Sequence, residues 1–339
     1  MAAPPFDVDA SRHSYTGGFF RQRLKNVLGA YVEGKINTGT TRGITEPPAA
    51  ARLMENRLAE EERINKVAET YRVLRNALRY QLSNLYDYDP AKHAVPDEKL
   101  TGLDRWILDD FAKLENEVAN SYDAFEFHVI YQRVSQFVAV ELSAIYHDVV
   151  KDRLYTDPAS SHRRRSTQTA LHRLVTQLTK MLTPILSFTA DEAWEFVPRK
   201  TESSVHLTVW QPSQFERSEN DRATWKSLFE LRELALPELE KARQAKTIGK
   251  ALEAKLTFTG GTPALTQAAE NKEALRELLN VSQLEFAPGT GENVTVSVKK
   301  ADGQKCERCW HWETDVGSNP EHPTICGRCV EAVQAAAKA

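Results

Sequence analysis

All four cysteines of this 339-residue chain lie near its end. They form two Cys-x-x-Cys pairs, Cys306 with Cys309 and Cys326 with Cys329, separated by sixteen residues. A Cys-x-x-Cys turn places two sulfur atoms on the same side of a tight loop, and zinc prefers four tetrahedral ligands. Two such turns about 15 to 20 residues apart are typical of a zinc site. The spacing therefore predicts that the four cysteines hold one zinc ion.

Four thiolates fill the coordination shell of zinc, so the site is predicted to be structural, with no position left for a catalytic water. His311 and His322 lie between the two pairs, and either is an alternative ligand. The alternatives to a zinc site are disulfides or free thiols. Because the segment has little apolar surface of its own, metal binding is expected to supply most of its folding free energy.

Two tryptophans, Trp310 and Trp312, stand beside the first cysteine pair. Indole rings can stack on unpaired nucleobases, a contact worth about 1 to 3 kcal/mol per base. The alternative is packing over the metal site, which the sequence favours more for Trp310 than for Trp312. Five Lys and Arg face six Asp and Glu from Lys299 to Glu331, so this tail is not a basic patch. Charge alone is therefore not expected to bind nucleic acid here.

Five basic residues elsewhere are further candidates for nucleic-acid contact: Arg163, Arg164, Arg165, Lys246 and Lys250. The three arginines follow His162 in a polar break between two predicted helices, where they can reach phosphates, unless they only line a solvated loop. The two lysines flank a turn into the next domain, at which Gly249 is expected to permit the backbone bend.

The composition indicates a globular protein of two or three domains. Of its residues 41% are hydrophobic, yet no run of 18 apolar residues occurs, and the first residues lack the features of a signal peptide. The expected location is the cytoplasm, where clustered cysteines are more often metal ligands than disulfides. The net charge of -3 gives no overall attraction to polyanions, so any nucleic-acid contact must be local.

The elements that position these residues are predicted to be mostly helices. From Ile64, apolar residues recur at steps of three and four and predict a helix that Pro90 cannot continue. The same period predicts three further helices, at 103–118, 127–149 and about 166–182. Beyond Pro184, Thr189 and Glu192 are predicted to form a capping box that begins a short helix.

The later part of the chain is predicted to be different. A polar connector at 201–218 precedes a helix at about 225–245, and alternation from Leu252 to Phe258 predicts a strand. A helix at 265–279 and two strand-like runs, "VSQLEF" and "VTVSV", complete a small α/β unit. The first sixty residues show no sustained period and are predicted to be irregular. The chain is thus predicted to be mainly α, divided into an extension of unknown role, a helical bundle, a linker, a small α/β subdomain and a zinc ribbon, at 1–60, 61–200, 201–224, 225–300 and 301–339.

Several blocks occur in a specific order between about Ile64 and Val330: "KVAETYRVLRNALRYQLSNLYDYDP", "LDRWIL", "LTPILSFTADEAWEF", "ARQAKTIGKALEAKL", "KCERCW" and "CGRC". This order resembles the C-terminal part of the bacterial isoleucyl-tRNA synthetases, a family of class I aminoacyl-tRNA synthetases. The resemblance implies an anticodon-binding helical bundle and a zinc ribbon whose ligands are the four cysteines. It also implies binding of tRNA, of the isoleucine type, in protein biosynthesis. In the full-length family enzyme, ATP drives the attachment of isoleucine to its tRNA.

The family binds ATP through His-x-Gly-His and Lys-Met-Ser-Lys-Ser motifs, and neither is present in the chain. The resemblance therefore implies a tRNA-binding portion without catalytic or editing domains, no aminoacylation by this chain alone, and a separate catalytic half as a partner. One alternative is a zinc-stabilised protein-interaction scaffold. A second is a DNA-repair glycosylase of the formamidopyrimidine type, which has similar cysteine knuckles. The glycosylase uses an N-terminal proline followed by Glu, which the start Met-Ala-Ala-Pro-Pro does not match.

Overall fold

The computed structural model describes residues 49–261, 263–289 and 293–337, with side chains at Glu62 and from Ile64 onward. The chain divides into two units, Met1–Ile64 and Asn65–Ala339, and the bundle, subdomain and ribbon all belong to the second. Most of the predicted N-terminal extension lies outside the described residues. None of the helices in the described ranges is long and apolar enough to cross a membrane.

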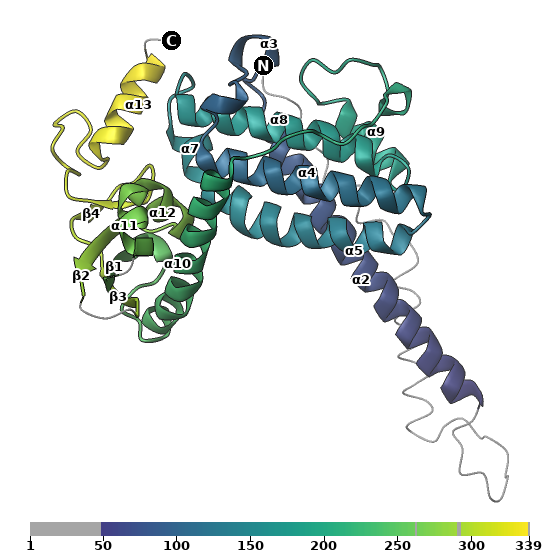
Figure 1. The fold of residues 1–339 in the computed structure, drawn as a ribbon, viewed down its shortest axis with the longest axis horizontal. Helices are drawn as coiled ribbons and strands as arrows, with labels where there is room; N and C mark the ends of the chain where they lie inside the picture. The colour runs from purple at the N-terminus through teal and green to yellow at the C-terminus, as the bar shows by residue number, and fades with distance from the viewer. Residues whose placement is uncertain (1–48, 262, 290–292, 338–339) are drawn as a thin grey trace, which may run out of the picture. The chain divides into compact units, whose positions relative to one another are not determined.

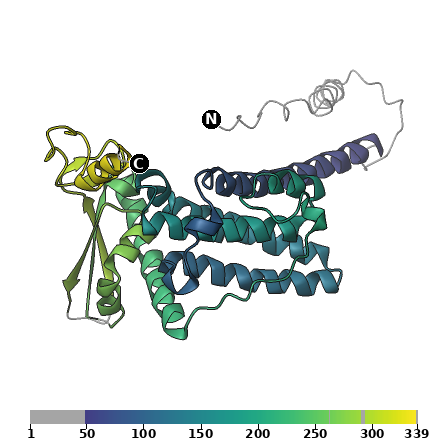
Figure 2. The ribbon, with the colours of Figure 1, turned by 90° about the horizontal axis from the view of Figure 1, so that it is seen from above.

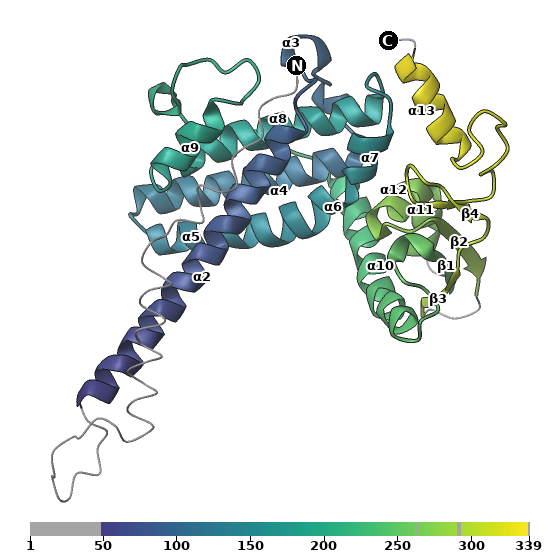
Figure 3. The same cartoon turned by 180° about the vertical axis from the view of Figure 1, so that it is seen from behind.

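The first part of the second unit is a helical bundle (Figure 1). Helix α4 is central, because it packs against α5, the π-helical segment η3 and α8, and its apolar face is buried along its whole length. Figure 3 shows the part of α2 from Asn65 onward lying across these helices on the side turned away in Figure 1. The elements of this part are α2 (Ala49–Ser83, which enters this unit at Asn65), α3 (Pro90–His93), η2 (Asp97–Lys99), α4 (Gly102–Asp123), α5 (Phe127–Phe137), η3 (Val138–Tyr146), α6 (His147–Val149), α7 (Lys151–Thr156), α8 (His162–Leu182), α9 (Ser187–Trp194) and η4 (Val205–Leu207).

The predicted helices are present, with differences at their ends. The helix predicted from Ile64 begins at Ala49, so the prediction that residues up to 60 are irregular is wrong for its last part. The segment predicted as one helix at 127–149 has a π-helical middle. The predicted capping box is also wrong, because α9 begins at Ser187. The hydroxyl of Thr189 instead bonds Tyr71 Oη at 3.0 Å.

The second part is a small α/β subdomain (Figure 2). Its strand order is β2-β1-β3, with β1 parallel to β2 and antiparallel to β3. Ala254, Leu256 and Phe258 alternate with more exposed residues on β1 and face the core, as predicted, whereas Leu252 precedes the strand. The elements are α10 (Glu219–Gln244), η5 (Ala251–Glu253), β1 (Ala254–Gly260), α11 (Pro263–Glu270), α12 (Lys272–Leu279), β2 (Gln283–Pro288) and β3 (Thr295–Lys300).

Helix α10 begins inside the segment predicted as a linker, and it ends in a Schellman motif. Thr247 N–H bonds the Ala242 carbonyl at 2.9 Å, and Lys246 N–H bonds the Arg243 carbonyl at 3.0 Å. The left-handed residue of this motif is Lys246, with φ of 58°. The expectation that Gly249 permits the bend is therefore wrong, since the positive φ lies three residues earlier.

A cysteine-rich ribbon follows the subdomain. Strands β4 (Gln304–Lys305) and β5 (Trp312–Glu313) pair antiparallel, and helix α13 (Gly327–Ala337) comes after them. With the bundle and the subdomain before it, this ribbon confirms the predicted fold class.

A buried arginine on α7 joins the bundle to the α/β subdomain. The guanidinium of Arg153 is 4% exposed and pairs with Asp104 of α4, at 3.3 Å, and with Glu277 of α12. Asp104 also accepts hydrogen bonds from four hydroxyl groups: Thr101, Tyr146, Ser166 and Thr167. Because Arg153 and Asp104 are both buried, this network fixes how the two parts meet.

Candidate metal centre and nucleic-acid interface

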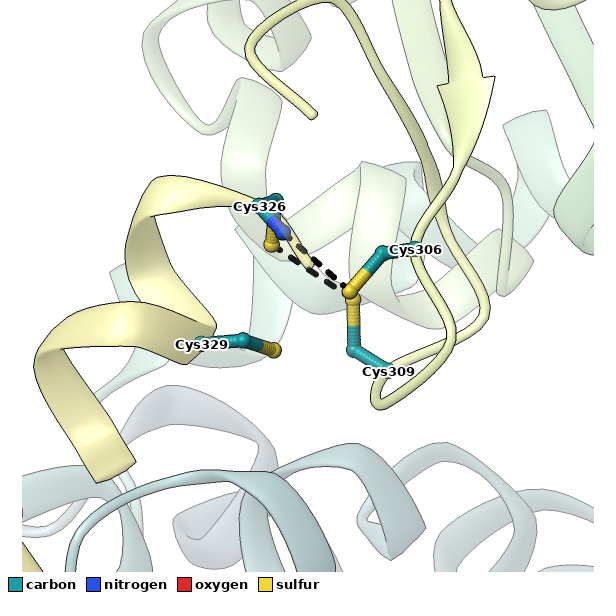
Figure 4. Close-up of side chains that lie close together, drawn as sticks. All are labelled: Cys306, Cys309, Cys326 and Cys329. Atoms are coloured by element: carbon teal, nitrogen blue, oxygen red, sulfur yellow. Dashed lines mark hydrogen bonds between the residues drawn. The ribbon is translucent and has the colours of Figure 1, made fainter. Parts of the chain in front are cut away.

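The four cysteine sulfurs converge at one point of the ribbon (Figure 4). Cys306 and Cys309 lie on the loop after β4, Cys326 directly precedes α13, and Cys329 lies in the first turn of that helix. The four sulfur atoms all lie within 4.8 Å of one another, and all four side chains are buried. Zn–S bonds of about 2.3 Å place the sulfurs of a tetrahedron roughly 3.8 Å apart. The Cys309 and Cys326 sulfurs are 3.8 Å apart, so the donor set fits zinc.

The surroundings of the thiols differ. Burial opposes ionisation of Cys306, but backbone N–H groups, including that of Cys326 at 3.4 Å, lower its pKa to about 7. The neighbouring thiol of Cys326 raises the pKa of Cys309 to about 12. A divalent cation is what allows four thiolates to share this space. When bound, zinc would act as a structural cross-link between the loop after β4 and α13.

The two histidines that the sequence offered as ligands are not part of this cluster. In the described ranges, the metal-competent group is made of the four cysteines. His311 is buried, and its backbone carbonyl accepts the N–H of Cys306 at 2.8 Å, while its Nδ1 faces Asp152 at 3.8 Å. Burial lowers the pKa of the His311 ring. The predicted donor set of four cysteines is therefore the one that the structure brings together.

Trp310 is the exposed aromatic residue of the ribbon, with 56% of its surface accessible. Its φ of 66° lies in the left-handed region, which costs an ordinary residue about 1 to 2 kcal/mol. The ring lies between two ammonium groups, those of Lys250 at 5.8 Å and Lys305 at 5.7 Å. The structure thus places two of the predicted contact residues, Trp310 and Lys250, together.

Trp312 is half-buried and packs within the protein. Its backbone N–H bonds the Ser282 hydroxyl at 2.7 Å, which ties the ribbon to the subdomain, and Lys300 Nζ lies 4.5 Å from the ring centroid. Its indole N–H has no hydrogen-bond partner among the described residues. The expectation that packing holds more for Trp310 than for Trp312 is therefore reversed.

The surface formed by Lys250, Lys300, Lys305, Trp310 and Trp312 is called the ribbon face below. Its three ammonium groups are exposed, and no described carboxylate lies within the 4 Å of an ion pair with any of them. Lys300 and Lys305 were not among the residues predicted to contact RNA. Their closeness in sequence to the first cysteine pair could have identified them, but the acidic residues of the same segment hid any basic patch. Lys246 is exposed at the end of α10 and is not one of the cations over these two rings.

The three arginines are not in a loop, as was predicted, but form the first turn of α8. Arg164 is buried and forms a bidentate pair with Asp87, with bonds of 2.5 and 3.1 Å. Arg165 Nη1 donates to the Asp87 carbonyl at 3.0 Å. Arg163 is 40% exposed and pairs with Asp157 at 3.2 Å. Because these side chains are held by partners in the protein, they are poorer candidates for phosphate contact than the ribbon face.

Comparisons with known proteins agree with this architecture. The family model described as the anticodon-binding domain of tRNA ligase matches residues 104–258, and that described as the zinc finger found in FPG and IleRS matches residues 303–332. The isoleucine–tRNA ligase of Syntrophotalea carbinolica is 41% identical over 281 residues, which cover 79% of this chain and 30% of that protein. That of Geobacter sulfurreducens is 37% identical over 284 residues, covering 81% and 31%.

A third relative gives the same extent of similarity. The isoleucine–tRNA ligase of Psychromonas ingrahamii is 38% identical over 287 residues, covering 81% of this chain and 30% of that protein. The chain thus spans about 30% of the length of the relatives it matches. It carries the anticodon-binding domain of a tRNA ligase followed by a zinc finger, and it is a homologue of part of the isoleucine–tRNA ligases.

Proposed function

We propose that this chain is the tRNA-binding portion of an isoleucine–tRNA ligase and that it grips the anticodon arm of isoleucine tRNA. The ATP-dependent attachment of isoleucine belongs, in this proposal, to a separate catalytic part. The anticodon-binding domain at 104–258 and the relatives named above support this assignment.

The observation that carries the proposal is the ribbon face. Single-stranded RNA loops are recognised by stacking of splayed bases on aromatic rings, while basic side chains hold the backbone. Trp310 offers an exposed ring between Lys250 and Lys305, and these ammonium groups have no carboxylate partner in the described ranges that phosphates would have to displace. The left-handed backbone of Trp310 destabilises the fold locally, and its exposed ring gains little packing to offset this. Such an uncompensated conformation favours a functional role.

The geometry supports a role for each residue. We propose that Trp310 stacks on a base of the anticodon loop and that Lys250 and Lys305 hold flanking phosphates. Lys246 remains a candidate for a phosphate further along the stem. Trp312 supports the face from beneath rather than stacking on RNA. Arg163 is the one arginine of its group with enough exposure to reach a phosphate.

The proposed domain division changes in one place. The bundle at 61–200 and the ribbon at 301–339 are retained as predicted. The α/β subdomain begins at Glu219 rather than at 225, because α10 is continuous from that residue.

The test is a titration of isoleucine, valine and methionine tRNAs with the zinc-loaded chain at two salt concentrations. Trp310→Ala should weaken binding of isoleucine tRNA by about 1 to 3 kcal/mol, and Trp312→Ala by less. Lys250→Gln with Lys305→Gln should weaken binding of all three and reduce the salt slope by about 1 for each lost phosphate contact.

The matched control is Lys226→Gln with Lys272→Gln, two exposed lysines on α10 and α12. This pair should leave both affinity and salt slope unchanged. Equal loss of affinity in the control and in the ribbon-face variant would mean that only overall charge matters. Undetectable binding of all three tRNAs by the wild type would refute the proposal and leave a protein-interaction scaffold in its place.

A further inference from the structure

The ribbon is fastened to the helical bundle by residues that lie between its cysteines. Arg308 and Arg328 each precede the second cysteine of a pair. Arg328 forms a bidentate pair with Asp152 of α7, with N···O distances of 2.5 and 2.7 Å. Arg308 Nη1 donates to the backbone carbonyl of Thr156, in the last turn of the same helix. Both anchors therefore leave the cysteine knuckles and end on α7.

Arg308 also contacts the cysteine cluster. Its Nη1 lies 3.7 Å from Cys329 Sγ, a sulfur of the other cysteine pair. One nitrogen thus contacts both a metal-ligand atom and the helical bundle. Hydrogen bonds to metal ligands from outer residues orient the ligands and tune the affinity for the metal. Through Arg308, movement of Cys329 and movement of α7 are physically connected.

The carboxylate of Asp152 holds its arginine partner firmly. Burial alone raises the pKa of Asp152, but the Arg328 guanidinium outweighs it and holds the pKa well below its usual range. Arg163 lies 3.4 Å from the same carboxylate and is shared with Asp157. Without Arg328, this buried carboxylate would be left with the longer Arg163 contact and the Thr156 hydroxyl at 3.0 Å, which is unfavourable for a buried charge. The position of Arg328 is therefore tightly defined by the bundle.

We propose that zinc binding and docking of the ribbon on α7 are one coupled equilibrium, with Arg308 and Arg328 as the positioning residues. The arginines can occupy these places together only when the two knuckles are held at the separation that four sulfurs around one ion impose. Removal of zinc frees the knuckles from each other, so the ribbon leaves α7. When the ribbon leaves α7, the ribbon face loses its fixed position relative to the bundle, and tRNA binding should weaken. Only this effect on tRNA binding rests on the proposed function.

Coupling of this kind is reciprocal: if zinc strengthens docking, docking strengthens zinc binding by the same factor. The decisive variant is therefore Asp152→Asn, which lies in the bundle and touches no cysteine. It should lower zinc affinity about tenfold, within the range of about 5- to 150-fold typical of coupled sites, in competition with a chromophoric chelator. The matched control is Asp148→Asn, whose carboxylate pairs with Lys151 at 2.8 Å rather than with the ribbon. It should bind zinc as the wild type does.

Substitutions of Arg328 give a second test of the coupling. Arg328→Gln should reduce zinc affinity by a similar factor, and Arg328→Lys, which keeps the charge, should lie between Gln and the wild type. This pair decides the matter if Asp152→Asn loses helical content by circular dichroism. Wild-type zinc affinity in Arg328→Gln would overturn the proposal, as would equal affinities in both aspartate variants when both are folded.

Hydrogen exchange tests the effect of zinc on docking of the ribbon. Removing zinc from the wild type with a chelator should speed amide exchange in α7 as well as in the ribbon, while α4 remains protected. Unchanged exchange in α7 would overturn the coupling. Neither experiment contains RNA. Absence of tRNA binding would therefore refute the proposed function without bearing on the coupling, and absence of the coupling would leave the proposed function untouched.

Discussion

The buried pair between Arg153 and Glu277 gives a sharp test of how the bundle and the α/β subdomain are joined. Arg153→Met removes a guanidinium that is 4% exposed and leaves Glu277, 16% exposed, without its bidentate partner. Asp104 loses one contact but keeps its hydroxyl donors, so most of the penalty falls on Glu277. Breaking a buried ion pair by removing one partner costs about 3 to 5 kcal/mol.

The assay is urea unfolding of the zinc-loaded chain, followed by circular dichroism, in a double-mutant cycle with Glu277→Gln. The double variant should recover part of the loss, with a coupling energy of about 1 to 3 kcal/mol, because neither charge is then left buried alone. The matched control is the exposed pair of Arg133 and Glu117, 2.6 Å apart, for which the same substitutions should cost about 0 to 1 kcal/mol. A cost for Arg153→Met no larger than that for Arg133→Met would show that burial of the first pair does not set its contribution.

Three further predictions concern pH, metal and chemistry. Burial and then Lys151 lower the pKa of His147 to about 3, so between about pH 6.5 and 3 only the unfolded chain takes up the proton. The free energy of unfolding should therefore fall by up to about 5 kcal/mol as the pH drops through this window, and His147→Phe should flatten that dependence. Metal analysis should find about one zinc per chain, lost in Cys306→Ser and kept in His322→Ala; zinc retained in the first variant would contradict the four-cysteine site. The chain alone should show no isoleucine-dependent exchange of pyrophosphate into ATP, and exchange by homogeneous protein would overturn that expectation.

Periodicity in the sequence was enough to predict the elements whose stability comes from one buried face. Helices α4 and α8 and strand β1 follow from apolar residues at regular spacing, since the core that they enter selects that spacing. The start of α2 was missed because "AAARLMENRLAEEER" has no apolar period. Its signal was helix propensity, from Ala, Leu, Glu and Arg. The π-helical segment at 138–146 keeps an apolar pattern, so the sequence did not distinguish it from the α-helix around it.

The metal site was predictable because its ligands lie close together in sequence, whereas its surroundings were not. Arg164 looked free beside two other arginines, but its partner Asp87 is 77 residues away and only tertiary structure brings them together. Lys250 and Trp310 meet for the same reason. The left-handed backbone of Trp310 is likewise invisible in its residue type, because that conformation is usual for glycine.

Recognition of the anticodon arm is tested most directly by comparing the binding of two halves of isoleucine tRNA. The zinc-loaded chain is titrated with the isolated anticodon stem-loop and with the acceptor minihelix, at one salt concentration, with Trp310→Ala in parallel. We predict that the stem-loop binds nearly as tightly as the whole tRNA, that the minihelix binds far more weakly, and that Trp310→Ala weakens only the stem-loop complex. Equal binding of both halves, or tighter binding of the minihelix, would contradict recognition of the anticodon arm by this chain.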